Sequence, residues 1–236
     1  MNIFKTNIKI RATIIVIACL ILATIGIWLL YANTSDAKVS AILGSLFAGL
    51  IVAIIQFIIA WQDYKQTEKL KELELIEVLY SRDSRAFYEK YIKRSQRKIN
   101  MMGVTASRFF NDFADDSPNA PKEAQILLDA LRRGVKVRIL LPESDYIENI
   151  NKKQDVDKVK QRVIEINKKY PSYSLEVKYF NHTPAHSIFN VDDKCIVGPV
   201  FPELESKYTP ALYLRNSSPI ANKYLTYFEY EWNRAE

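Results

Sequence analysis

The sequence contains only two cysteines and two histidines among its 236 residues. Cys19 and Cys195 lie far apart in the chain, so they cannot form a disulfide framework, and two lone thiols fit a reducing cytosol. The histidines, His182 and His186, both lie in the segment NHTPAHS. Pro184 lies between them and breaks any helix that would bring the two rings to one face, which argues against a metal site. The sequence therefore predicts no metal and no cofactor.

Charged residues are also absent from two long stretches near the N-terminus, Ala12 to Ser35 and Val39 to Gln62. Each stretch has 24 residues, more than the roughly 20 that a helix needs to cross about 30 Å of hydrocarbon. The first stretch is too long for the apolar region of a signal peptide, and a second follows at once, so we expect both to be retained. The sequence predicts a transmembrane helical hairpin over residues 12–62, after an N-terminal tail of residues 1–11.

Positive charge flanks the predicted hairpin on one side. Lysines and arginines precede the first stretch and follow the second, whereas the connecting loop holds only Asp36 and Lys38; the flanking residues are Lys5, Lys9, Arg11, Lys65, Lys69 and Lys71. The positive-inside rule then predicts a multi-pass protein of the bacterial inner membrane with both termini in the cytoplasm. The formal net charge of +6 fits these flanks, and it also fits a phosphate-rich partner.

The second stretch repeats small residues at every fourth position, namely Ala41, Ser45, Gly49 and Ala53. In lipid, helices pack where small side chains let their backbones approach closely. This row fits packing on the first span of the same chain. It also fits packing between protomers, which could create an oligomer or a pore.

A charged helical linker is expected next, over residues 63–97. Apolar residues recur there at three- to four-residue spacing between lysines and glutamates, which predicts an amphipathic helix from Gln62 to about Tyr80; they are Leu70, Leu73, Ile76 and Leu79 or Tyr80. Such a stripe fits a short dimer seam or a face packed on the soluble domain. A further helix is predicted over Ala86 to Gln96.

The remaining residues, 98–236, alternate between strand and helix patterns. Strands are predicted over Lys98 to Thr105, Val135 to Leu141, Leu175 to Phe180, Ser187 to Val191, Cys195 to Val197 and Ala211 to Leu214. Helices are predicted over Glu123 to Arg133, Val156 to Lys169 and Pro219 to Arg234, with a polar loop from Asp112 to Pro121. This alternation predicts the α/β class, with an α/β sandwich domain following the membrane hairpin.

Four segments in this region together resemble the phospholipase D-like superfamily. They are RSQRKINMMGVTASRF, LLDALRRGVKVRILLPES, HSIFNVDDKCIVG and the closing IANKYLTYFEYEW. The resemblance covers roughly Ser84 to Glu236, and it implies a phospholipase D-like cytoplasmic domain.

The signature of that family is His-x-Lys, four residues and Asp, and here His186, Ile188 and Asp193 occupy its places. In active members the histidine attacks phosphorus, the lysine holds the phosphoryl oxygens and the aspartate orients the histidine. Ile188 removes the cationic clamp, and Pro199 follows Gly198 where a small hydroxyl residue is usual. Electrostatic groups of this kind each stabilise the transition state by about 2.7–4 kcal/mol. The resemblance therefore implies a degenerate site at His186 and Asp193, and a pseudoenzyme with little or no turnover.

A single signature copy implies that any composite site needs a homodimer. The layout is similar to two-span effectors of bacterial antiphage systems, including retron and other abortive-infection modules, in which activation disrupts the inner membrane. The first hypothesis is thus a membrane-acting toxin effector whose degenerate domain senses or scaffolds. The second is a homodimeric phosphodiesterase, nuclease or phospholipase, with a composite histidine site, and the third is a constitutive anchor. The expected partners are the lipid bilayer, further copies of the chain, and a phosphorylated ligand or a regulatory protein or nucleoprotein.

Overall fold

The computed structural model describes residues 3–201 and 203–235, and within these the side chains of residues 3–12 and of residue 69 lie outside the description. The side chains of Lys5, Lys9, Arg11 and Lys69, which the orientation argument uses, therefore lie outside the described ones. The chain divides into two compact units, residues 1–69 and 70–236. Each unit is described by itself below.

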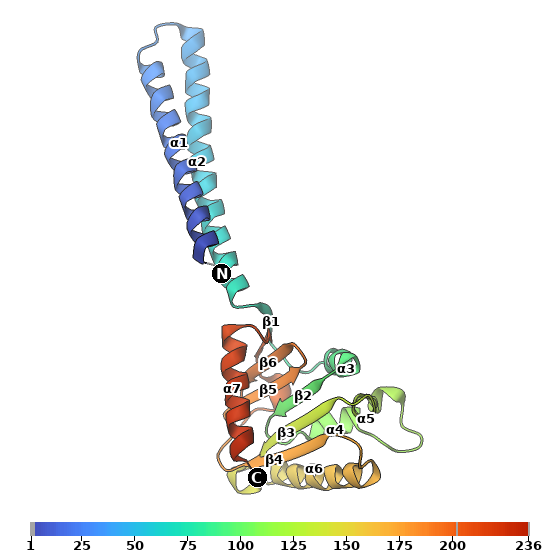
Figure 1. Ribbon diagram of the computed structural model, residues 1–236. Helices are drawn as coiled ribbons and strands as arrows, with labels where there is room; N and C mark the ends of the chain where they lie inside the picture. The colour runs from blue at the N-terminus through green and yellow to red at the C-terminus, as the bar shows by residue number, and fades with distance from the viewer. Residues whose placement is uncertain (1–2, 202, 236) are drawn as a thin grey trace. The chain divides into compact units, whose positions relative to one another are not determined.

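The first unit is a pair of long helices, α1 (Ile3–Ala32) and α2 (Ala37–Glu72), which lie side by side and run in opposite directions (Figure 1). Two helical segments are long and apolar enough to cross a membrane, Thr13–Ala32 and Ala37–Glu72. Their apolar side chains are largely exposed, Leu22, Ile42 and Ile59 among them. The tail predicted over residues 1–11 is helical from Ile3 onward and continuous with the first span.

The second unit is built on one seven-stranded sheet with the order β1-β7-β6-β5-β2-β3-β4. The strands are β1 (Leu75–Leu79), β2 (Lys98–Met102), β3 (Lys136–Pro142), β4 (Leu175–Phe180), β5 (His186–Val191), β6 (Lys194–Pro199) and β7 (Ala211–Arg215). Strands β2, β3 and β4 are parallel, whereas the pairs β2–β5, β5–β6, β6–β7 and β7–β1 are antiparallel. The predicted α/β class with two N-terminal apolar helices is confirmed.

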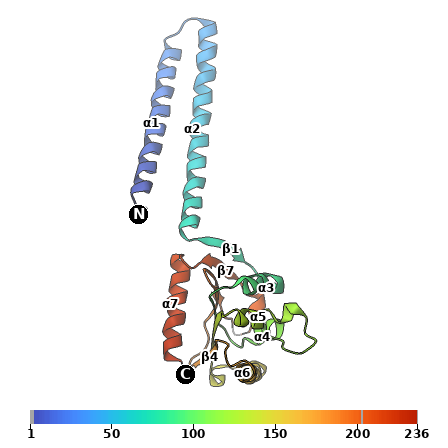
Figure 2. The same cartoon turned by 45° about the vertical axis from the view of Figure 1, so that its right-hand side comes forward.

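Helices cover both faces of this sheet. One face carries α7 (Pro219–Arg234), and the other carries α3 (Arg85–Arg94), α4 (Ser107–Phe113), α5 (Ile126–Arg132) and α6 (Ile150–Lys169), as two views show (Figures 1 and 2). Short 3-10 turns lie at Lys122–Ala124, Ser144–Tyr146 and Ser206–Tyr208. Each face of the sheet has its own hydrophobic core, to which alternating strand residues contribute. Ile99 and Ile139 pack on the side of the four helices, whereas Met102 and Leu140 pack under α7.

Local sequence explains where several of these elements begin and end. Ser84, Asn149 and Ser218 cap the N-termini of α3, α6 and α7, each side chain accepting a backbone N–H of the first turn. Pro219 follows at the first turn of α7, where its missing N–H costs nothing. Gly134 lies just beyond α5 with a φ of 87°, a left-handed conformation that favours glycine.

The expected linker helix over Gln62 to Tyr80 was wrong in its second half. Helix α2 ends at Glu72, and Leu75–Leu79 forms the edge strand β1, which pairs with β7. Glu74 has a φ of 48°, which ends the helical path. The stripe residues consequently do not share one face, because alternate side chains of a strand point to opposite sides.

A second difference is a short helix, α4, that was not predicted; of the loop predicted over Asp112 to Pro121, only the first two residues are helical. Helix α4 begins at Ser107 and runs to Phe113, and its three phenylalanines, Phe109, Phe110 and Phe113, are all buried. The helix is short, and its periodicity is hidden by adjacent aromatic residues.

Candidate functional site

The signature strand β5 places its residues on both faces of the sheet. His186 and Ile188 point toward α7, whereas Phe189 packs on the opposite, four-helix side. The His186 ring meets the edges of two α7 rings, with centroid distances of 5.4 Å to Tyr224 and 5.5 Å to Tyr227. His186 is half-buried, and its side chain has no hydrogen-bond partner among the described residues.

Ile188, at the place of the signature lysine, is fully buried. It belongs to the apolar cluster beneath α7, together with Met102, Val197 and Phe228. A cation at this position would lie in the core, where an unpaired charge is strongly disfavoured. The strand therefore offers no phosphate clamp at this position.

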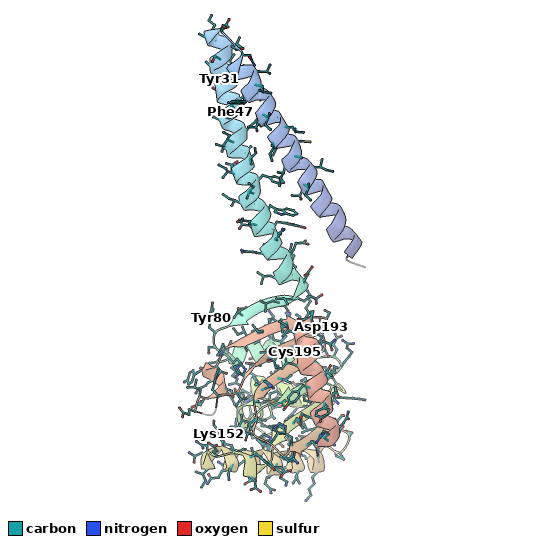
Figure 3. All side chains as sticks on the ribbon, turned by 90° about the vertical axis from the view of Figure 1, so that its left-hand side faces the viewer. Tyr31, Phe47, Tyr80, Lys152, Asp193 and Cys195 are labelled. Atoms are coloured by element: carbon teal, nitrogen blue, oxygen red, sulfur yellow. The ribbon has the colours of Figure 1, made fainter. Side chains whose placement is uncertain are left out.

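Asp193 lies at the opposite end of β5 from His186, in the turn that leads to β6. Seven residues of extended chain separate the two positions by roughly 20 Å. Figure 3 shows Asp193 at one end of the α/β unit and Lys152 at the other. The structure thus does not bring His186 and Asp193 of one chain together.

Its neighbour Asp192 has the better-defined contacts. The Asp192 carboxylate accepts backbone N–H groups of Gln96, Arg97 and Lys98 at 2.9–3.0 Å. Burial raises the pKa of this carboxyl, but the three N–H donors outweigh burial and leave the pKa below its ordinary value. Asp192 has a φ of 51°, a conformation that Asp tolerates better than most residues. This aspartate anchors the start of β2 to the β5–β6 turn.

The other histidine, His182, lies on the same side of the sheet as His186. Its Nε2 is 3.1 Å from the Glu231 carboxylate of α7, and Glu231 is buried. Burial raises the pKa of Tyr227, and the adjacent Glu231 raises it further. Within residues 3–201 and 203–235, no group of three or more His, Cys, Asp or Glu side chains is placed to hold a metal.

The small residues predicted to pack in the membrane lie mostly away from α1. Ala41, Ser45 and Gly49 are exposed, whereas Ala53 is half-buried between the helices. A Cβ added at Gly49 would meet nothing within 4 Å, whereas one added at Gly44 would lie 3.6 Å from the Tyr31 ring. Figure 3 labels Tyr31 and Phe47, two of the aromatic residues of the hairpin. Among the described side chains, the predicted row thus largely lacks a helix partner.

A cavity of the α/β unit lies on the four-helix side of the sheet. It has a volume of about 490 Å³ and is lined by the carboxyl end of β2, the start of β5, α4 and the segments before α3 and α6. Its size falls within the range of small-molecule sites, about 300–1,000 Å³. Sequence reasoning missed this cavity, because its lining residues come from segments more than 100 positions apart, such as Arg82 and Ser187.

No protein-family model and no curated protein matches the chain. Among solved structures, the chain is similar to TrmBL2, an archaeal chromatin protein whose structure shows a novel mode of DNA binding. That match has a TM-score of 0.46 and 15% identity, and it covers 83% of this chain and 70% of TrmBL2.

The chain is also similar to phosphatidylserine synthase of Haemophilus influenzae Rd KW20. Here the TM-score is 0.44 and the identity 10%, over 68% of this chain and 39% of the synthase. The chain thus spans well under two thirds of the length of that enzyme. The structure itself shows a mixed α/β unit and two N-terminal helices that are long and apolar enough to cross a membrane.

Proposed function

We propose that the chain is a membrane-anchored effector whose α/β domain is a non-hydrolytic, phospholipase D-like module that senses or scaffolds. In this proposal the domain controls the transmembrane hairpin, and the hairpin perturbs the bacterial inner membrane, as in the abortive-infection effectors that the layout resembles. The observation that carries the non-hydrolytic part is the complete burial of Ile188 beneath α7.

Hydrolysis by the phospholipase D-like route needs a histidine and a cation on the same phosphoryl group. Here the place of the cation is filled by an aliphatic side chain in a packed core. Asp193 lies at the far end of β5 and does not orient His186 within one chain. These features favour a fold that keeps its framework and has lost its catalytic electrostatics.

The hairpin supports an active role for the membrane part. Ala41, Ser45 and Gly49 form a row of small residues on a face of α2 that α1 leaves uncovered. Since small residues permit close helix packing in lipid, this face fits association between copies of the chain. We propose a homo-oligomer in the inner membrane, multi-pass, with both termini in the cytoplasm. A regulatory protein or nucleoprotein partner would supply the trigger.

The test is the membrane potential of bacteria after induced expression, followed with a voltage-sensitive dye. We expect wild type and His186→Ala to depolarise the cells, and Gly49→Leu to be silent because a bulky side chain blocks the close approach of helices. Gly26→Leu is the matched control: it makes the same change on the first span, where an added Cβ also meets nothing within 4 Å. Membrane-fraction blots establish equal amounts of each variant.

One observation favours a second candidate, a homodimeric phosphodiesterase. His186 is half-exposed at a strand end, and its imidazole has no hydrogen bond to the described residues, so a partner chain could complete a site. If only His186→Ala silences the protein while Gly49→Leu still depolarises the cells, the enzyme is the better account. If no variant differs from an empty vector, the effector proposal fails for the chain acting alone.

A further inference from the structure

The cavity on the four-helix side of the sheet contains a buried guanidinium. Arg82, between β1 and α3, is 6% exposed and lines the cavity. Its Nη1 donates to Ser187 Oγ at 2.6 Å, and its Nη2 donates to Thr209 Oγ1 and to the Pro199 carbonyl oxygen. The buried Nε has no acceptor among the described residues.

All of these acceptors are neutral, and among the described residues no carboxylate pairs with Arg82. Other cations of the cavity are compensated: Arg108 lies 2.5 Å from an Asp83 carboxylate oxygen, and Lys207 lies 2.9 Å from Glu205. Burial lowers the pKa of Arg82, and the nearby Tyr88 opposes this. A buried charge without a counter-charge costs several kcal/mol. The cavity thus holds a cation that has no carboxylate partner among the described residues.

A second arginine lies at the exposed rim of the same cavity. Arg85 donates to the Asp112 carbonyl oxygen at 3.0 Å, and its guanidinium lies 5.9 Å from the centre of the Phe113 ring. Both partners are neutral, so this charge is also available to an anion. The residues that line the cavity include five arginines and lysines but only three carboxylates, which are Asp112, Asp155 and Glu205.

The remaining wall is apolar and aromatic. The Tyr88 and Phe109 rings both meet the Phe189 ring, at centroid distances of 5.1 and 5.9 Å. Met101 and Phe113 extend this wall. A ligand that fits must therefore combine a compact anionic group with an apolar or ring-containing part.

We propose that this cavity binds a small organic phosphate, with the phosphate on Arg82 and Arg85 and the organic part against the wall of Tyr88, Phe109 and Phe189. Arginine suits this ligand because its planar fork gives parallel, charge-assisted hydrogen bonds to phosphate oxygens. A soluble nucleotide and a phospholipid headgroup share this chemistry. The inference rests on the proposed function in so far as this phosphate is the ligand that the domain senses. Its test measures binding, whereas the test of the proposed function measures depolarisation, so either proposal can fail without the other.

The experiment is calorimetric titration of the full chain in an uncharged detergent with adenosine monophosphate, inorganic phosphate and adenosine. We expect the monophosphate to bind more tightly than phosphate, and adenosine to bind least. Arg82→Gln and Arg85→Gln should each weaken binding of the monophosphate by about tenfold or more, the value of one charge-assisted hydrogen bond. Arg132→Gln, an exposed arginine outside the cavity, is the matched control and should bind as wild type does.

Arg82→Gln is interpreted only if its circular dichroism matches that of wild type; otherwise the exposed Arg85→Gln decides. The inference is overturned if wild type binds no phosphate compound at millimolar concentration, or if Arg85→Gln and Arg132→Gln behave alike. Repeating the titration in nanodiscs with and without phosphatidic acid separates the two sources. Competition by the lipid assigns the site to a headgroup, and unchanged affinity assigns it to a soluble phosphate.

Discussion

At the scale of single residues, two adjacent aspartates have different roles. Asp193 occupies the aspartate position of the family signature, yet it is exposed in a turn. Asp192 accepts three backbone N–H groups and joins the β5–β6 turn to the start of β2. A hydrogen bond to a charged group contributes about 1.5–3 kcal/mol to the free energy of unfolding. Asp192 is therefore the aspartate that stabilises this turn.

Asp192→Ala should lower the free energy of unfolding at pH 7 by about 2 kcal/mol, whereas Asp193→Ala should change it by less than about 0.5 kcal/mol. Because the folded pKa of Asp192 lies below its ordinary value, its contribution is complete above the unfolded-chain pKa of about 3.9 and is lost as the pH falls through the folded pKa. Urea unfolding at pH 7 and pH 3 checks this. Equal effects of the two alanines would contradict it.

Restoring the signature lysine makes a second prediction at this scale. Ile188→Lys places an ammonium group in the core beneath α7, so we expect a loss of about 3 kcal/mol or more in the free energy of unfolding. Ile188→Leu conserves the volume and should cost less than about 1.5 kcal/mol. Urea unfolding measures both, and a chromogenic phosphodiester assay accompanies it. A stable, hydrolytic Ile188→Lys would show that the burial of this site does not prevent catalysis.

At the scale of elements, β1 shows how a tertiary partner overrides a helical pattern. Its backbone pairs with β7, with Leu75 opposite Leu214 and Val78 opposite Leu212. Glu74 holds the turn in place, since its carbonyl accepts the Arg215 N–H at 3.1 Å and its carboxylate accepts the Ser217 hydroxyl. The three- to four-residue spacing of apolar residues is also compatible with a strand, whose side chains alternate between the two faces of the sheet. Strand β1 therefore belongs to the α/β unit, and it covers an edge of β7 that would otherwise be unpaired.

The expected consequence concerns two fragments without the hairpin, residues 70–236 and 81–236. The longer fragment retains β1 and should show a melting temperature several degrees higher, because the shorter one loses the antiparallel pairing and exposes the edge of β7. Differential scanning calorimetry and light scattering compare the two. Identical melting temperatures and identical monodispersity would mean that β1 is dispensable to the fold.

At the scale of the whole molecule, the chain joins a helical hairpin to an α/β unit that has its own two cores. The hairpin helices expose apolar side chains along most of their length, as a lipid-facing pair would. The α/β unit instead buries most of its large apolar side chains, in a core on each face of the sheet. These opposite burial patterns fit lipid around the hairpin and water around the α/β unit.

The proposed orientation predicts the reactivity of introduced thiols in a chain with Cys19→Ser and Cys195→Ala. Asp36→Cys, between the helices, should react with a membrane-impermeant maleimide in spheroplasts. Gln161→Cys, exposed on α6, should react only after lysis. Gel shifts measure both. Labelling of Gln161→Cys before lysis would reverse the orientation, and labelling of neither position before lysis would refute an external loop.

Much of the architecture was predictable from the sequence alone. The two uncharged apolar stretches predict the long helices, because length and hydropathy are properties of the local chain. The strand and helix alternation from Lys98 onward predicts the α/β class, and Leu175–Phe180 and Pro219–Arg234 match their predicted bounds. The departure of Ile188 from the signature is likewise a local fact.

Only the tertiary structure decided the rest, since it depends on contacts between distant segments. Pairing with β7 made β1 a strand, and packing under α7 made Ile188 a core residue. The cavity needed Arg82 and Ser187 to meet across 105 positions of sequence. Whether a polar side chain is buried without a counter-charge depends on what the fold brings around it, and no periodicity of the sequence records that.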